Sequence, residues 1–373
     1  MPLLNWPEIL EIAFFVVSVA ELIFLFFFFI RLPLFKVDCD TQIREMPVSV
    51  IISAKNEARN LSRYLPLILE QDYSSYEVIV VNDKSFDNTR ELLEELSAKY
   101  PHLQVVQVEE HIHDFKGKKL GLTLAIKRAN HEFLLFTDAD CRPRDKQWLK
   151  LMQRNLQEKD IVLGFSPYMR KGNLINTLIQ YETFHTAFQY FSFALAGMPY
   201  MGVGRNMGYK RSLFFSGKGF ANHLGVASGD DDLFVNQHAT KENVAIELCP
   251  ETHILSEPKE NFSQWMYQKR RHLTSGKFYR KKHRAILLMS WWINFLFYAL
   301  FAAVMVADPQ NYIVPAIFGG VFLSRAVIIV LSLKKLKMMF MAWWVMLLDI
   351  LFQLFLYPLL GLFMMVSRKP SNW

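Results

Sequence analysis

The chain has 373 residues, of which 52% are hydrophobic, and its formal net charge is +7. This length suffices for a full soluble domain together with several membrane segments. The positive charge lacks the groove pattern of basic and aromatic residues that nucleic-acid binding needs, which argues against a nucleic-acid partner. The cysteines Cys39, Cys141 and Cys249 are widely spaced and match neither a metal motif nor a disulfide framework, so we expect a reducing cytosol.

The first predicted element is a membrane anchor within residues 1–35. Residues 13–30 are almost wholly apolar and, with their ends, approach the roughly 20 residues that a membrane span needs. Glu8 and Glu11 precede this segment in place of Lys or Arg, and no small-x-small cleavage site follows it. An uncleaved anchor is therefore favoured over a signal peptide.

Alternating strands and helices are predicted next. The apolar runs at residues 48–53 and 76–81 suit buried strands, and each is followed by polar residues and then a helix, over residues 58–71 and from about residue 89. A third strand is expected at residues 103–108. Strands and helices that alternate at this spacing predict a parallel sheet.

A lysine-rich loop, residues 115–119, precedes the next predicted helix. Lysines at a helix start oppose the macrodipole, which suggests that an anion such as phosphate is bound there. Lys118 is therefore a candidate phosphate ligand, and a solvated basic turn is the alternative.

Two aspartates follow the apolar run at residues 131–136. Asp138 and Asp140 are expected at the carboxyl end of a strand, where open α/β sheets bind ligands. Carboxylate oxygens suit Mg²⁺ or Mn²⁺ rather than zinc. The alternative is a plain strand-end turn, in which Asp is common.

Downstream, Asp230, Asp231 and Asp232 form an acidic run, which by itself is typical of a solvated loop. Aromatic side chains near Trp265 lie beside a cluster of basic residues, and we interpret residues 263–284 as a basic interfacial segment. An aromatic stripe over residues 174–200 predicts core packing, or a second interfacial helix.

Three further membrane segments are predicted in residues 285–373. Residues 285–307, 312–333 and 338–366 are each long enough to span, and we expect the charges of Arg325 and Asp349 to face other helices or a polar cavity. Basic residues crowd positions 269–284 and 334–337, which predicts that both clusters are cytoplasmic and contact anionic lipid.

In combination, these motifs resemble the family 2 glycosyltransferases, inverting enzymes with a single Rossmann-like domain of the GT-A type. The resemblance covers most of residues 46–280, and the membrane-anchored branch of the family has similar flanking spans. It implies an α/β fold class, with a GT-A nucleotide-sugar domain and mixed sheet at residues 46–262 between one N-terminal and about three C-terminal transmembrane helices. The motifs are VSVIISAKNEARNL, YEVIVVNDKSFDNT, KGKKLGL, FTDADC, GRNMGYKRSLF, SGDDDLFV and QWMYQKRRH.

The resemblance assigns the donor side of the site. Asp138 and Asp140 would hold Mg²⁺ or Mn²⁺ at the diphosphate, with Asp140 preferred as the direct ligand. Asp83 would accept a hydrogen bond from the base, and Glu57 would help to hold uridine. Lys118 would sit near the diphosphate. The family usually has two Asp residues where this chain has Asn82-Asp83.

On the acceptor side, the resemblance places the catalytic base on Asp231, with Asp230 as the alternative. The acceptor loop contains Arg205 and Asn206. Gln268 and Arg271 match the Gln-x-x-Arg motif that closes over the donor. His272 replaces the usual Trp of that motif, which argues against processive polymer synthesis.

We therefore expect a membrane-integrated, metal-dependent inverting glycosyltransferase with a cytosolic catalytic domain. The expected donor is a nucleotide sugar, UDP-linked, and the acceptor is a lipid-linked or other glycan. One alternative is a polyprenyl-phosphate glycosyltransferase that charges a lipid carrier. Another is a non-catalytic nucleotide-binding subunit of a polysaccharide synthesis or export system. A solute transporter is disfavoured by the large soluble insert.

Overall fold

The computed structural model describes residues 5–40, 42–109 and 117–366. The chain divides into two compact units. Of the described residues, those within 36–183 and 197–279 form the sheet unit, and residues 5–35, 184–196 and 280–366 form the helical unit. The lysine-rich loop predicted at residues 115–119 lies partly outside the described residues, which resume at Gly117.

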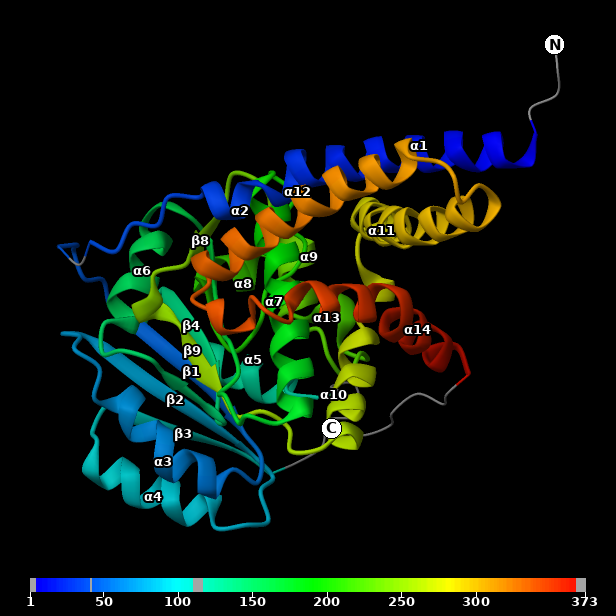
Figure 1. The fold of residues 1–373 in the computed structure, drawn as a ribbon. Coiled ribbons are helices and arrows are strands. Elements are labelled where there is room, and N and C mark those ends of the chain that lie inside the picture. Colours follow the sequence, from blue (N-terminus) through cyan, green and yellow to red (C-terminus); the bar gives the residue numbers. More distant parts are fainter. Residues whose placement is uncertain (1–4, 41, 110–116, 367–373) are drawn as a thin grey trace. The chain divides into compact units, whose positions relative to one another are not determined.

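The sheet unit is built on a mixed seven-stranded sheet with the order β3-β2-β1-β4-β7-β6-β8 (Figure 1). The first four strands in this order are parallel, which confirms the predicted parallel core, and β7 runs antiparallel to both β4 and β6. A separate two-stranded sheet pairs β5 with β9. The strands are β1 (Val48–Ala54), β2 (Tyr76–Asp83), β3 (Leu103–Val108), β4 (Phe133–Asp138), β5 (Cys141–Pro143), β6 (Ile161–Gly164), β7 (Met207–Lys210), β8 (Val244–Glu247) and β9 (Ile254–Ser256).

Helices cover both faces of this sheet because its central strands are apolar on both sides. Val50 and Ile52 of β1 pack in one core with Leu65 of α3 and Trp148 of α6. On the other face, a Cβ atom at Gly121 of α5 would lie 2.6 Å from the Val81 side chain, so this helix packs directly on the strand. Helices α3 and α4 lie side by side (Figure 1). The helices are α3 (Ala58–Leu69), α4 (Thr89–Lys99), α5 (Lys119–Arg128), α6 (Trp148–Glu158), α8 (Arg211–Ser216), α9 (Asp232–His238) and α10 (Phe262–Leu273).

The helical unit contains four helices that are long and apolar enough to cross a membrane. One is N-terminal and three are C-terminal, as the sequence predicts. The N-terminal helix consists of α1 (Trp6–Phe24), a π-helical turn (Leu25–Phe29) and α2 (Arg31–Leu34). The candidate spans are Trp6–Leu34, Lys281–Ala307 (α11), Ile313–Lys335 (α12) and Val345–Leu362, the last formed by α13 (Val345–Leu351), a π-helical turn (Phe352–Leu356) and part of α14 (Tyr357–Val366).

The aromatic stripe belongs to α7 (Leu174–Leu195), which runs from the sheet unit into the helical unit. Within the helical unit, Phe188 stacks on Phe29 with ring centroids 4.6 Å apart, and Phe184, Phe188 and Phe191 are buried. The two ring nitrogens of His185 are hydrogen-bonded to the Gln353 side chain and to the Tyr357 hydroxyl. In this structure the stripe is therefore core packing.

The charged residues of the spans face one another. Arg325 on α12 makes two hydrogen bonds to the Asp349 carboxylate, at 2.8 and 3.0 Å, and its Nη1 lies 2.7 Å from Glu21 Oε1 on α1. All three side chains are buried. The expectation that Arg325 and Asp349 face other helices is thus confirmed, and this ion-pair network joins three of the four candidate spans.

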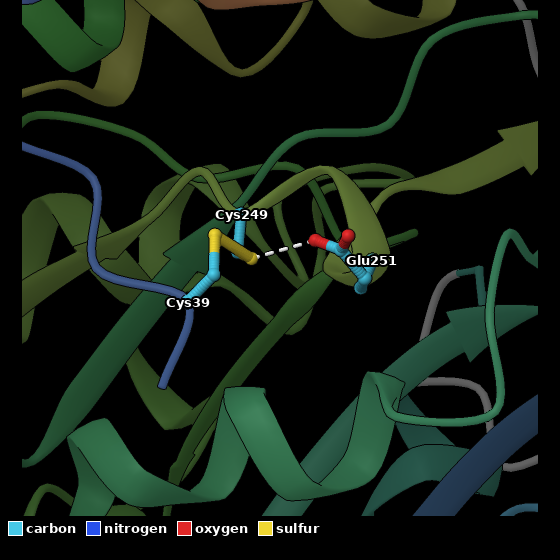
Figure 2. Close-up of side chains that lie close together, drawn as sticks. All are labelled: Cys39, Cys249 and Glu251. Atoms are coloured by element: carbon cyan, nitrogen blue, oxygen red, sulfur yellow. Dashed lines mark hydrogen bonds between the residues drawn. A yellow bond between two sulfur atoms is a disulfide. The ribbon is translucent and has the colours of Figure 1, made fainter. Parts of the chain in front are cut away.

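The cysteine prediction was wrong. Cys39 and Cys249 form a disulfide, and a carboxylate oxygen of Glu251 lies 2.7 Å from Cys249 Sγ (Figure 2). Within the described chain these three residues are the one group of three or more His, Cys, Asp or Glu side chains whose ligand atoms all lie within 4.8 Å of one another. Because the two sulfur atoms are bonded to each other, neither is available as a thiolate ligand.

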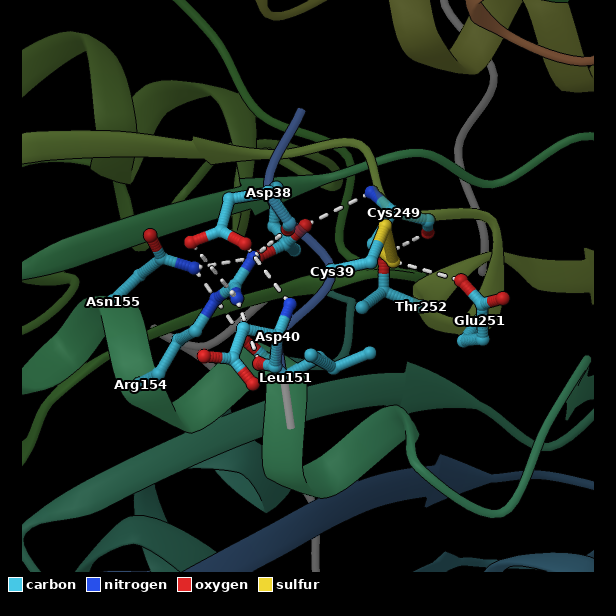
Figure 3. Close-up of a disulfide and its surroundings, with 10 residues drawn as sticks. Asp38, Cys39, Asp40, Leu151, Arg154, Asn155, Cys249, Glu251 and Thr252 are labelled. Carbon is cyan, nitrogen blue, oxygen red and sulfur yellow. Dashed lines mark hydrogen bonds and ion pairs between the residues drawn. A yellow bond between two sulfur atoms is a disulfide. The ribbon is translucent and has the colours of Figure 1, made fainter. Parts of the chain in front are cut away.

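The fold brings these cysteines together although 210 residues separate them. The chain that follows α2 is fastened to α6, where Arg154 donates to the carbonyl oxygens of Asp38 and Asp40 and pairs with Glu247 at 2.8 Å (Figure 3). Disulfides are typical of oxidising compartments, so the cysteines no longer support a cytosolic location.

Candidate functional site

The polar residues predicted for donor binding gather at one edge of the parallel sheet. Ser53, near the end of β1, pairs with Val81 of β2 and with Asp138 of β4, so the carboxyl ends of these strands lie side by side. Glu57 follows β1, and Asp83 is the last residue of β2. The prediction that Asp138 lies at the carboxyl end of a strand is confirmed, because Asp138 is the last residue of β4.

The loops after β1 and β2 are joined by direct hydrogen bonds. The backbone N–H of Asn56 donates to Ser85 Oγ at 2.9 Å, and Asn56 Oδ1 accepts the N–H of Phe86 at 2.7 Å. The N–H of Glu57 donates to Thr89 Oγ1 at 3.0 Å. Asn56 adopts a positive φ of 58°, which Asn tolerates better than most residues. These bonds fix the backbone on which Glu57 is carried.

Asp83 and its neighbour Asn82 have different surroundings. Asp83 is half-buried, and within the described residues its carboxylate makes no hydrogen bond or ion pair, so it is available to a ligand. Asn82 is buried and donates to Gln107 on β3 at 2.8 Å. The residue that departs from the family pattern is thus directed at the neighbouring strand.

At the end of β4, acidic and basic groups are in contact. Lys118 Nζ lies 2.5 Å from Asp138 Oδ1. Although burial opposes it, the Lys118 ammonium lowers the pKa of Asp138, whereas burial and the negative charge of Asp138 raise the pKa of Asp140. Burial also raises the pKa of Glu57, and the charges of Asp140 and Asp138 contribute to that rise.

This donor set fits a divalent cation. Asp138 and Asp140 present oxygen ligands, which Mg²⁺ and Mn²⁺ prefer. The mutual repulsion that raises the pKa of Asp140 would be relieved by a positive ion between the two carboxylates. Glu57 adds a third negative charge to the same region.

The acidic run lies where a loop meets the first residue of α9, and we call residues 226–232 the acid loop. Asp231 caps α9: its carboxylate accepts the N–H of Asp232 at 2.7 Å and, from the acceptor loop, the N–H of Gly204 at 2.8 Å. Burial and the charges of Asp230 and Asp232 raise the pKa of Asp231 to about 7. A carboxyl with this pKa suits general base catalysis near neutral pH.

Lys118 connects the acid loop with the donor residues. Although burial opposes it, the charges of Asp138 and Asp230 raise the pKa of Lys118, and Arg271 of α10 acts in the opposite sense. Arg271 also contributes to the lowered pKa of Asp138. The structure therefore brings the aspartates at both motifs into one charged neighbourhood, as the enzyme interpretation requires.

The predicted acceptor residues separate into two groups. The Arg205 guanidinium carbon lies 4.2 Å from the centre of the Tyr168 ring, and Gln268 donates to the Tyr168 hydroxyl at 3.2 Å. Although burial opposes it, the nearby Tyr168 and Cys141, followed by Asp140 and Asp138, raise the pKa of Arg205. Its Nη1 is buried and, within the described residues, has no hydrogen-bond partner.

The side chain of Asn206, in contrast, belongs to the core. It is completely buried, donates to the carbonyl oxygens of Phe165 and Thr252 at 2.8 Å, and accepts from Trp148 Nε1 at 3.0 Å. Sequence reasoning missed Tyr168, because a single tyrosine outside the predicted strands and helices carries no motif. It also left Lys119 unassigned, although Lys119 adjoins Lys118.

Comparisons with known proteins find glycosyltransferases. The family model described as glycosyl transferase family 2 matches residues 49–215. The chain is 35% identical over 105 residues to the glycosyltransferase AglE of Haloferax volcanii, covering 28% of this chain and 33% of that protein. It is 33% identical over 132 residues to a dolichol-phosphate mannosyltransferase of Pyrococcus furiosus, covering 35% and 36%. The matched segments span about a third of the length of these relatives.

The mannosyltransferase PcManGT from Pyrobaculum calidifontis, solved with GDP-Man and Mn²⁺, shares the fold. The likeness has a TM-score of 0.57 at 21% identity and covers 92% of this chain and 98% of that one. The family match thus identifies residues 49–215 as a family 2 glycosyltransferase domain, and the likeness to PcManGT shows its GT-A fold.

Proposed function

We propose that the chain is a membrane-integrated inverting glycosyltransferase that moves a sugar from a nucleotide sugar to a lipid-linked or glycan acceptor. The observation that carries this proposal is the position of Lys118, which bonds to Asp138 and whose pKa responds to Asp230. The Lys118 ammonium thus bonds to a donor-site carboxylate and interacts electrostatically with Asp230 of the acid loop.

On the donor side, Asp138 and Asp140 would hold Mg²⁺ or Mn²⁺, which would neutralise the departing diphosphate. Lys118 would add positive charge beside that group. Asp83, whose carboxylate is available, would accept a hydrogen bond from the base, and Glu57 would support the nucleoside. We propose a UDP-linked donor. GDP-mannose is the second candidate, because the fold neighbour was solved with it.

On the acceptor side, Asp231 would accept the proton of the attacking hydroxyl. Two backbone N–H groups hold its carboxylate in place, and its pKa of about 7 leaves it ionised in a large share of molecules at neutral pH. Asp230 remains the alternative base. Gln268 and Arg271, both on α10, would contact the bound donor and acceptor.

A phosphorylated polyprenol is the second candidate acceptor. The buried Nη1 of Arg205 is free to bind a phosphate oxygen, and the Pyrococcus furiosus relative is named as a dolichol-phosphate mannosyltransferase. Parallel assays with phosphorylated polyprenol and with a glycolipid distinguish these acceptors. If Arg205 binds the phosphate of the acceptor, we expect Arg205→Lys to impair transfer to the phosphorylated polyprenol more than transfer to the glycolipid.

The location proposed is an integral membrane protein with its sheet unit at the cytoplasmic face. Four apolar helices support the first part. The cytoplasmic position of the sheet unit is inferred from the basic residues near the ends of α10 and α12. The disulfide gives no support to this position. Protease digestion of inverted and right-side-out vesicles tests it, because the sheet unit is expected to be cut only in the inverted ones.

The enzymatic test uses purified protein and a panel of nucleotide sugars with Mg²⁺, Mn²⁺ or EDTA. We expect release of a nucleoside diphosphate from one class of donor, with loss of release in EDTA and in Asp140→Asn. A protein that releases no nucleoside diphosphate from any donor in the presence of a membrane extract would support the non-catalytic subunit instead.

A further inference from the structure

The three aspartates of the acid loop differ in their partners. The carboxylate of Asp231 accepts two backbone N–H groups, and that of Asp230 makes no hydrogen bond or ion pair within the described part of the chain. Asp232 is buried, and its Oδ2 accepts the hydroxyls of Ser275 and Tyr279, the latter at 2.7 Å. The Asp232 carboxylate therefore binds side chains that follow α10, whereas the carboxylates of Asp230 and Asp231 do not.

Ser275 and Tyr279 lie just beyond the end of α10, the helix that carries Gln268 and Arg271. A second contact joins the same two segments, because Ser228 Oγ donates to the carbonyl oxygen of Arg271 at 3.1 Å. The acid loop is thus joined to the end of α10 at two points, Ser228 and Asp232.

The start of α5 holds the acid loop from another side. Lys119 is completely buried, and its ammonium donates to the carbonyl oxygens of Val226 and, at 2.7 Å, of Ser228. Gly117, at a φ of 69°, packs against the loop, since a Cβ atom there would lie 2.2 Å from the carbonyl oxygen of Ala227. The turn that presents Lys118 to the donor site therefore also supports the acid loop.

We propose that Asp232 is a positioning residue that holds the acid loop and α10 at a fixed distance and orientation. Asp231 on the loop and the Gln268 and Arg271 side chains on the helix then contact the substrates at the same time. This inference rests on the proposed glycosyl transfer. A carboxylate fits the role because one oxygen accepts both hydroxyls while the other, Oδ1, accepts the N–H of Leu233 at 2.7 Å, whereas the amide of asparagine has only one acceptor oxygen.

Two variants test the proposal. In Asp232→Asn and Tyr279→Phe, we expect kcat to fall by about 10- to 100-fold, since small displacements of catalytic groups have effects of that size. The Kd for the nucleotide sugar is expected to rise by a smaller factor than kcat falls, because the donor residues on β2 and β4 are untouched and only the contacts from α10 are displaced. Tyr100→Phe is the matched control: it removes another tyrosine hydroxyl bonded to a carboxylate, that of Glu70, at the opposite edge of the sheet.

A pH profile separates positioning from general loss of structure. The charged or titratable groups that face Asp231 are Asp230, Asp232, Lys119 and Tyr279. Asp232→Asn removes one negative charge from this set, so the acidic limb of kcat is expected to move to lower pH, whereas partial unfolding would lower kcat at every pH alike. An unchanged kcat and limb in both variants would overturn the proposal.

Hydrogen exchange provides a readout that does not depend on transfer. In Asp232→Asn we expect faster amide exchange in residues 226–232 and 264–279 than in wild type or Tyr100→Phe. If the wild type transfers no sugar at all, the proposed function fails, and exchange alone then decides the role of Asp232. Unchanged exchange in these two segments would refute that role.

Discussion

The raised pKa of Asp231 leads to a specific pH dependence. A base acts only when it is ionised, so transfer is expected above the pKa of about 7 and to be lost as the pH falls through it. Below the midpoint the rate falls about tenfold per pH unit, and at pH 5 it should lie roughly 100-fold below the plateau. Asp230→Asn removes a charge that raises this pKa, so its midpoint should shift to lower pH with most of the plateau rate kept.

The assay measures kcat from pH 5 to 9 with saturating donor, acceptor and metal ion. Donor Kd is measured at each pH, because the pKa of Asp140 is also raised and metal binding will weaken in acid. A rate that stays level down to pH 5 would refute the assignment of Asp231 as the base. If Asp230→Asn abolished transfer while Asp231→Asn retained it, Asp230 would be the base instead.

Three further predictions address other parts of the molecule. Lys118→Gln removes a charge-assisted bond worth about 1.5–3 kcal/mol, so we expect donor Kd, measured by calorimetry, to rise roughly 10- to 100-fold. Arg325→Met leaves two buried carboxylates without their partner and should destabilise the detergent-solubilised protein by about 3–5 kcal/mol in thermal unfolding, with Ser324→Ala as the neutral control. Cys39→Ser opens a loop of 210 residues, with an expected loss of up to about 5 kcal/mol of sheet-unit stability in denaturant titration; no loss would show that the disulfide is dispensable.

The parts of the fold that the sequence predicts are those with strong local patterns. β1, β2 and β4 are continuous apolar runs that end in polar residues, and this pattern is sufficient to predict both their burial and the edge at which Asp138 lies. The four candidate spans are equally clear from the sequence, because a run of about 20 apolar residues is typical of a membrane span. β6 and β8, with four residues each, are too short to show a period and were not predicted.

The roles of several residues depend on tertiary contacts, which the sequence alone does not show. Asp230, Asp231 and Asp232 are identical in type, and only the distant hydroxyls of Ser275 and Tyr279 distinguish the third aspartate from the other two. The disulfide escaped prediction because no spacing rule links cysteines that are 210 residues apart. Asn206 stands in the acceptor motif, yet its backbone position turns its amide into the core.

The most direct test of the account compares donor binding and sugar transfer in Asp140→Asn and Asp231→Asn. Asp140 is assigned to donor binding and Asp231 to deprotonation of the acceptor in the same reaction. We expect Asp140→Asn to lose metal-dependent donor binding, and Asp231→Asn to bind the nucleotide sugar as the wild type does while transferring none of it. Normal transfer by either variant, or loss of donor binding in Asp231→Asn, would contradict the account.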